Sequence, residues 1–130
     1  MIKEEKIKYW LDLADYDLET SEHMLNTKRY LYVGFMCHQV IEKTLKAYYV
    51  SIKNETPPYT HNLRYLAELS NIYSLFLDEH KAFINELMPL NIEARYPSYK
   101  EKLLKSLNHN RCADILSRTK ELKSWIEKKL

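Results

Sequence analysis

Apolar residues recur along most of this chain at alternating spacings of four and three, and no other feature constrains its fold as strongly. Such spacing places side chains along one face of an α-helix, whereas a strand needs alternation with a period of two. No segment alternates convincingly in that way, so we expect no strands. In the first segment, from Lys3 to Asn26, the recurring positions are Ile7, Leu11, Ala14, Leu18, Ser21 and Leu25.

The segment from Tyr30 to Ile52 carries a broader apolar face, which predicts a second helix at the centre of the core. Gly34 lies inside it and is the sole glycine of the chain. Because glycine costs a helix interior up to about 1 kcal/mol relative to alanine, we expect another helix to approach closely at this point. A single glycine also excludes the glycine-rich loops that bind nucleotide phosphates.

The remaining helices are separated by proline-containing segments. Residues 54–60 contain Pro57 and Pro58 and predict a loop, after which Thr60 is expected to cap a short helix over residues 61–69. A further helix is predicted over residues 77–94.

Pro97 is expected to end that stretch, and Ser98 and Glu101 have the spacing of a capping box for another short helix. The last helix is predicted over residues 110–128. Together the segments predict an all-α fold, an up-and-down bundle of four long helices plus one or two short helices.

The size and charge of the chain narrow its function classes. At 130 residues we expect one domain, residues 1–130. With 20 basic and 18 acidic residues, the charge is too balanced for a protein that binds nucleic acid through a generally basic surface. Cys37 and Cys112 fall on apolar stripes, as reduced core thiols do, and no segment has the roughly 18 apolar residues of a membrane span. We expect a cytoplasmic protein.

On the second helix His38, Glu42 and Lys46 are spaced four apart, so their side chains lie along one ridge beside the apolar face. One interpretation is a polar groove wall that binds a phosphate or a carboxylate of a partner. The other is a set of surface or interface ion pairs. His38 and Glu42 could supply two metal ligands, but the stronger His-Glu-x-x-His pattern is absent, so we expect no metal and no cofactor.

A second group of candidate residues surrounds the end of the helix predicted over residues 77–94. Arg95 and Tyr96 suit nucleotide binding, because arginine binds phosphate with two hydrogen bonds and tyrosine stacks on bases. The same residues suit ordinary packing at a helix end. Both interpretations stay open at this point.

Other polar side chains give weaker signals. The chain has 11 tyrosines against three phenylalanines, a bias that fits either an interface or a narrow core reaching the surface. His61 is expected to make local hydrogen bonds, and His80 to face solvent. Cys37 and His38 are adjacent on a helix and point about 100° apart, which disfavours a thiolate pair for nucleophilic catalysis.

Three stretches, taken in order, resemble the HEPN domain family of bacteria and archaea. They are Cys37-His-Gln-Val-Ile-Glu-Lys-Thr-Leu-Lys-Ala47, Thr60-His-Asn-Leu63 and Glu93-Ala-Arg-Tyr-Pro97. The resemblance implies a helical bundle that is often a homodimer. It also implies two kinds of activity: many members are partners of a small nucleotidyltransferase, some of them in toxin–antitoxin type pairs, and others are metal-independent ribonucleases.

The ribonucleases of the family carry an arginine followed by a histidine, with four to six residues between them. No arginine of this chain is followed by a histidine at that spacing. We therefore expect, leaning away from an enzyme, a non-catalytic homodimer that binds a nucleotide or is the accessory partner of a small nucleotidyltransferase. The alternative is a ribonuclease toxin that binds RNA. The residues that match the family and that we expect to bind the nucleotide or partner are His38, Glu42, Lys46, Arg95 and Tyr96, with no catalytic residue among them.

Overall fold

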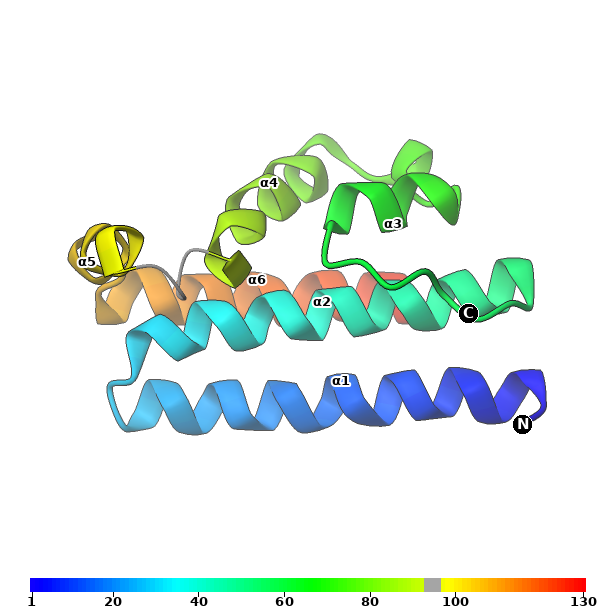
Figure 1. The fold of residues 1–130 in the computed structure, drawn as a ribbon, viewed down its shortest axis with the longest axis horizontal. Coiled ribbons are helices and arrows are strands. Elements are labelled where there is room, and N and C mark those ends of the chain that lie inside the picture. The colour runs from blue at the N-terminus through cyan, green and yellow to red at the C-terminus, as the bar shows by residue number, and fades with distance from the viewer. Residues whose placement is uncertain (93–96) are drawn as a thin grey trace.

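The computed structural model describes the backbone of residues 1–92 and 97–130 and the side chains of residues 1–91 and 101–130. All of the regular elements in these ranges are helical, which confirms the predicted all-α bundle (Figure 1). The elements are α1 (Lys3–Asn26), α2 (Tyr30–Lys53), α3 (Leu63–Leu69), the short 3₁₀ helix η1 (Tyr73–Leu75), α4 (Asp78–Ile92), α5 (Pro97–Ser106) and α6 (His109–Glu127).

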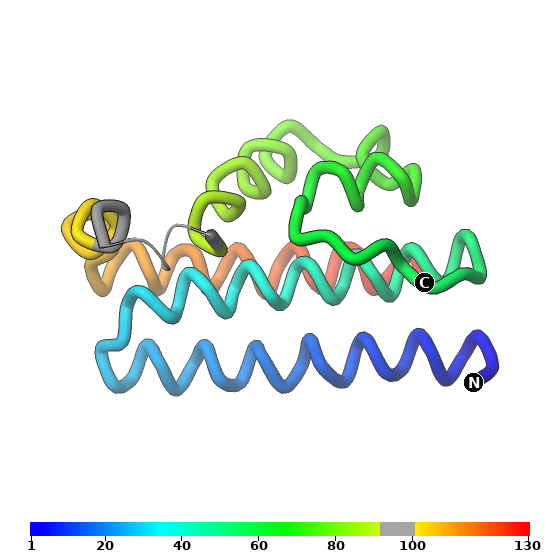
Figure 2. Tube along the Cα trace, in the orientation of Figure 1, coloured from blue at the N-terminus to red at the C-terminus, as the bar shows by residue number. Residues whose placement is uncertain are grey.

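Helix α2 is the centre of the bundle. It runs antiparallel beside α1, with α6 packed along both of them and with α3 and α4 on the side of α2 away from α1 (Figures 1 and 2). The two chain termini lie at one end of the bundle, and the α1–α2 turn and α5 lie at the other. This arrangement explains the broad apolar face predicted for α2, since the helix has neighbours on several sides.

Helices α2 and α4 approach each other closely at Gly34, as predicted from its place in the sequence. A Cβ atom built on Gly34 would lie 2.9 Å from Cδ1 and 3.4 Å from Cβ of Leu90. The Leu90 side chain is itself buried in the core. The missing side chain therefore lets the two helices pack against each other at this level.

Helix α1 lies at the edge of the bundle and is less buried than its apolar stripe predicts. Of the predicted positions only Ala14 and Ser21 are buried, together with Asp17, while the four aliphatic positions are half-buried. Asp17 accepts a short hydrogen bond from Lys43 of α2. Because α1 packs mainly against α2 and less against α6, one flank of α1 is left without a neighbour among the described residues.

Two predicted helix boundaries are wrong. Asn62, not Thr60, caps α3: its side chain accepts a hydrogen bond from the backbone N–H of Tyr65 at 3.0 Å. The Thr60 hydroxyl instead accepts from the backbone N–H of Asn62. Pro97 begins α5 rather than ending a helix, which fits the fixed φ of proline in a first helical turn, so Ser98 lies inside the helix and not at its cap.

The prediction that His80 faces solvent is also wrong. Only 12% of its side chain is exposed. Its ring centroid lies 4.5 Å from that of Trp125 on α6 and 5.6 Å from that of Phe76. Because Trp125 is distant in the sequence, the position of His80 within α4 did not indicate its burial.

Both cysteines are buried free thiols, as predicted. The Cys37 sulfur lies 3.3 Å from the hydroxyl of Ser21, which connects α2 to α1. Burial raises the pKa of the Cys37 thiol, and it raises that of Cys112 to about 11. The thiols are therefore part of the apolar core.

Among the described residues, none of the helices combines the length and the apolar character that crossing a membrane requires.

Candidate functional site

Three polar side chains surround the carboxylate of Glu42. Its Oε2 accepts a hydrogen bond from Lys46 Nζ at 3.1 Å, one turn further along α2. Its Oε1 accepts from His61 Nδ1 at 2.8 Å and lies 3.9 Å from His38 Nδ1. We call His38, Glu42, Lys46 and His61 the Glu42 cluster.

Three members of the Glu42 cluster are buried although they are charged or titratable. His38 is 1% exposed, Glu42 3% and Lys46 6%. The Lys46 ammonium lies 5.3 Å from the ring centroid of Trp10 on α1, within the range of a cation–π interaction. The ridge predicted from the sequence therefore exists, and it lies inside the bundle rather than on its surface.

His38 is held as a neutral imidazole. Burial lowers its pKa to about 4, although the Glu42 carboxylate and a hydrogen bond with the backbone of His61 both act to raise it. His38 Nδ1 has no hydrogen-bond partner among the described residues. An unsatisfied buried ring nitrogen of this kind costs free energy.

His61 is the member that sequence reasoning misplaced. The expected local hydrogen bonds were wrong, because His61 instead reaches 19 residues back along the chain to Glu42. It connects the loop before α3 to α2 and keeps 38% of its side chain exposed. The sequence signal that could have indicated this placement of His61 is the Thr60-His61-Asn62-Leu63 stretch. In it the turn at Thr60 and the cap at Asn62 fix the backbone on either side of His61.

The cluster is built to hold charge rather than to transfer protons. Glu42 is compensated by Lys46 and by a hydrogen bond from His61. His38 is neutral at pH 7 and closed to solvent, so a substrate hydroxyl cannot come within the roughly 3 Å that a general base needs. The only substantial opening to solvent among these four side chains is at His61.

The other two predicted site residues, Arg95 and Tyr96, lie outside the described residues, as does Ala94 at the predicted helix end. The structure does describe the hydrogen bond that holds the end of α4, just before these residues, against α2. Gln39 Nε2 of α2 donates a 2.6 Å hydrogen bond to Oδ1 of the buried Asn91 in the last turn of α4. The end of α4 is therefore fixed against α2, at a residue that is adjacent in the sequence to His38.

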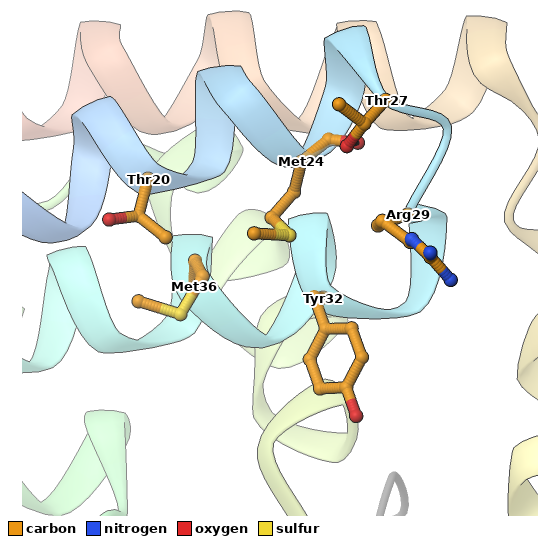
Figure 3. Close-up of a pocket in the computed structure, with 6 residues that line it drawn as sticks. All are labelled: Thr20, Met24, Thr27, Arg29, Tyr32 and Met36. Carbon is orange, nitrogen blue, oxygen red and sulfur yellow. Dashed lines mark hydrogen bonds between the residues drawn. The ribbon is translucent and has the colours of Figure 1, made fainter.

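A hollow of about 500 Å³ lies between α1 and α2 near their connecting turn. Its walls are mostly apolar, with two methionines and a tyrosine, and Arg29 lies at its rim. The lining side chains lie on one side of the two helices, with α6 passing behind (Figure 3). They are Thr20, Met24, Thr27, Arg29, Tyr32 and Met36.

Within residues 1–91 and 101–130, no group of three or more histidine, cysteine or carboxylate side chains is arranged to hold a metal ion. His38, Glu42 and His61 come nearest in composition. The Glu42 oxygens are already engaged by Lys46 and His61, and Lys46 adds a positive charge that a cation would have to oppose.

Comparisons with known proteins agree with this architecture. The crystal structure of TT1696 from Thermus thermophilus is similar in fold, with a TM-score of 0.78 and 17% sequence identity over 96% of this chain and 98% of that one. None of the curated proteins compared with the chain matches its sequence. Protein-family models match the HEPN domain over residues 7–129. Since this match covers nearly the whole chain, the protein belongs to the HEPN domain family.

Proposed function

We propose that this HEPN domain is a non-catalytic binding module, which forms a homodimer and acts as the nucleotide-binding or accessory partner of a small nucleotidyltransferase. The burial of His38 is the observation that carries this proposal. A cytoplasmic pairing of the toxin–antitoxin type is the cellular setting in which such a partner would act. The chain is proposed as one HEPN domain over residues 1–130.

The proposal follows from what the polar residues can and cannot reach. A ribonuclease needs a general base within hydrogen-bond distance of a ribose hydroxyl. His38 is closed to solvent, and no arginine of the chain is followed by a histidine at the spacing of the ribonucleases. A buried, compensated cluster instead favours a rigid scaffold, because its members stabilise one arrangement of α2 and the loop before α3.

The five predicted residues take two roles in this proposal. Arg95 would bind phosphate and Tyr96 would contact a base at the end of α4. His38, Glu42 and Lys46 would support that site by fixing α2, to which Gln39 and Asn91 anchor α4. Direct contact of Lys46 with phosphate would require the Glu42 cluster to open.

The first experiment is a pull-down of the tagged chain from its own cells, with bound protein identified by mass spectrometry and bound RNA by nuclease digestion. A stoichiometric nucleotidyltransferase supports the proposal. Metal-independent cleavage of RNA by the purified chain, abolished in a His38→Ala variant that keeps its helicity, would overturn it in favour of the ribonuclease.

The site assignment has its own test by calorimetry with ATP as the probe. Arg95→Ala is expected to weaken binding at least tenfold, since it removes a charged phosphate contact. Arg64→Ala is the matched control, because Arg64 lies on the exposed side of α3 and is paired with Glu68. Equal affinities for the two variants would remove Arg95 from the site.

A further inference from the structure

His80 closes the first turn of α4 with its imidazole ring. Leu77 is the residue before α4, and its backbone N–H donates a hydrogen bond to Nδ1 of His80 at 3.1 Å. His80 is the third residue of the helix, the position at which glutamate or glutamine makes the same contact in a capping box. The ring therefore satisfies a backbone donor that has no partner inside the helix.

The same ring also joins α4 to the end of α6. Its centroid lies 4.5 Å from that of Trp125 and 5.6 Å from that of Phe76, and the rings of Phe76 and Trp125 lie 5.6 Å apart. We call residues 72–81, which include η1 and the first turn of α4, the α4 corner. Because His80 both caps α4 and packs on Trp125, it holds the α4 corner against α6.

The His80 cap differs from a glutamine cap because protonation can remove it. A neutral imidazole has one N–H and one acceptor nitrogen, whereas an imidazolium has two N–H groups and no acceptor. Since Nδ1 of His80 accepts from Leu77, the ring that makes this hydrogen bond is neutral and carries its proton on Nε2. Protonation would make Nδ1 a second donor, facing the N–H of Leu77.

The surroundings of His80 favour the neutral ring. Burial lowers the pKa of His80 below its ordinary value of 6.5, and a positive charge in the first turn of a helix also opposes the helix dipole. Glu79, whose Oε1 lies 4.0 Å from Nε2, raises the pKa, and Lys129 of α6 lowers it. Residues 72–77 contribute no charged side chain. The charged residues beside His80 in the chain or around it on α6 are Asp78, Glu79, Lys81, Arg118, Glu121 and Lys129.

Solvent reaches His80 in the folded chain. Its side chain is 12% exposed, and a hollow of about 50 Å³ between α4 and α6 borders the ring. His38 is different, since it is 1% exposed and, with a pKa of about 4, stays mostly neutral above pH 5. Mild acid can therefore protonate His80 while His38 is still neutral and the bundle is still folded.

We propose that His80 is a pH-sensitive cap, which holds the α4 corner against α6 when its ring is neutral and releases the α4 corner when the ring is protonated. Above pH 6.5 the corner is closed. As the pH falls below 6.5 and through the pKa of His80 in the folded chain, the hydrogen bond from Leu77 is lost and the stabilising contribution of the cap is lost with it.

Release of the α4 corner would uncover an apolar surface. Leu75 and Leu77 are already about half exposed, and the buried Phe76 lies between them and packs on Trp125. The cap involves no residue of the proposed binding site, so its failure would leave the proposed function untouched.

The test follows the Leu77 amide of the full chain by nuclear magnetic resonance between pH 7.5 and 5. Its signal is expected to shift with the same midpoint as the His80 ring. Its protection against hydrogen exchange, corrected for the intrinsic rate, should fall roughly fivefold, the effect of losing one helix cap. An unchanged Leu77 amide while the His80 ring titrates would overturn the proposal, and so would a ring that stays neutral down to pH 5.

Two variants, verified for helicity by circular dichroism, separate the cap from the aromatic contact. His80→Gln keeps an acceptor that does not titrate in this range, so Leu77 should stay protected down to pH 5. His80→Phe keeps a ring against Trp125 without an acceptor, so Leu77 should lose its protection even at pH 7.5. A loss on acidification that persists in His80→Gln would assign the effect to another group and overturn the cap, as would full protection in His80→Phe.

Release of the α4 corner is measured by tryptophan fluorescence. The wild type and His80→Gln both contain Trp10 and His38, so the difference between them reports the surroundings of Trp125. Acidification to pH 5 is expected to shift the emission of the wild type to longer wavelength, as Trp125 becomes exposed, and to leave His80→Gln unchanged. Equal emission of the two proteins throughout would mean that the cap releases nothing, and the switch would be excluded.

Discussion

The Glu42 cluster and the pair Tyr32 and Met36 lie on different sides of α2, and they reverse the usual distribution of polar and apolar groups. His38, Glu42 and Lys46 are charged or titratable and are buried. Tyr32 and Met36 lie elsewhere around the same helix and are partly or mostly exposed. The comparison shows that the burial of a side chain on α2 depends on whether another element packs on that side of the helix, and not on the polarity of the side chain.

The two regions are also expected to differ in how they contribute to stability. The Glu42 cluster acts within one chain, because the buried Lys46 ammonium loses its partner if Glu42 is removed. Exposed side chains such as Tyr32 on α2 and Tyr16 on α1 contribute little to the stability of the single chain. Substitutions of comparable size should therefore have very different effects on the isolated fold.

The largest effect is expected from Glu42→Ala. This variant leaves the Lys46 ammonium buried without its carboxylate and removes the acceptor of His61, so it should lower the free energy of unfolding by about 3–5 kcal/mol. Urea denaturation at pH 7 measures it. Glu19→Ala is the control, since Glu19 is exposed on α1 and should change stability by less than about 0.5 kcal/mol. Equal effects of the two substitutions would mean that the cluster adds nothing to the fold.

The second effect is a loss of stability on acidification, caused by His38. Its pKa of about 4 lies below the ordinary histidine value of 6.5, so the unfolded chain binds the proton more readily. The stabilising contribution is therefore complete above about pH 6.5 and is lost as the pH falls towards 4, with a limit of about 3 kcal/mol.

The measurement is urea denaturation between pH 4 and 7 of the wild type and of His38→Asn. The variant should show a smaller pH dependence over that interval. His80, whose pKa burial also lowers, remains in both proteins and cancels in the comparison. Identical slopes would exclude His38 as a buried neutral group.

A third and smaller effect is expected on another side of α2, where Gly34 contacts Leu90. In Gly34→Ala the new methyl group meets the Leu90 side chain at 2.9 Å, and the crowding outweighs the gain in helix propensity. We expect a net destabilisation of about 1 kcal/mol by thermal unfolding. Pairing it with Leu90→Val should recover part of the loss, whereas a stabilised single variant would contradict the close approach.

The smallest effect is expected from Tyr16→Ala. Its side chain is 72% exposed, so the stability of the single chain should change by less than about 0.5 kcal/mol. The comparison must be made at a protein concentration well below the dimer dissociation constant, because dimerisation adds stability by mass action. A loss above about 1 kcal/mol under those conditions would place Tyr16 in the core of its own chain.

The sequence was sufficient for the helical class and for most element positions, because period and proline placement are local signals. The predicted helix over residues 3–26 agrees with α1, and the one over residues 110–128 agrees with α6 within about one residue. The caps were less predictable. Thr60 and Asn62 both have capping side chains, and only the path of the chain decides which of them precedes the first helical turn.

The sequence was sufficient to predict which residues of α2 share the site, but not whether their side chains are buried. Spacing alone places His38, Glu42 and Lys46 on one ridge, but a charged ridge beside an apolar face is equally compatible with surface and interior. The decisive contacts come from residues distant in the sequence, Trp10 and His61. Such contacts depend on tertiary packing, and helical periodicity carries no information about them.

The buried thiol of Cys37 gives this protein a built-in reporter of opening. Its sulfur lies at the junction of α1 and α2 with no exposed surface, and its raised pKa keeps it protonated at neutral pH. Thr119 of α6 also hydrogen-bonds this thiol, so an alkylating reagent can modify Cys37 only when the helices packed around it separate. Its labelling rate would show how often the bundle opens around α2.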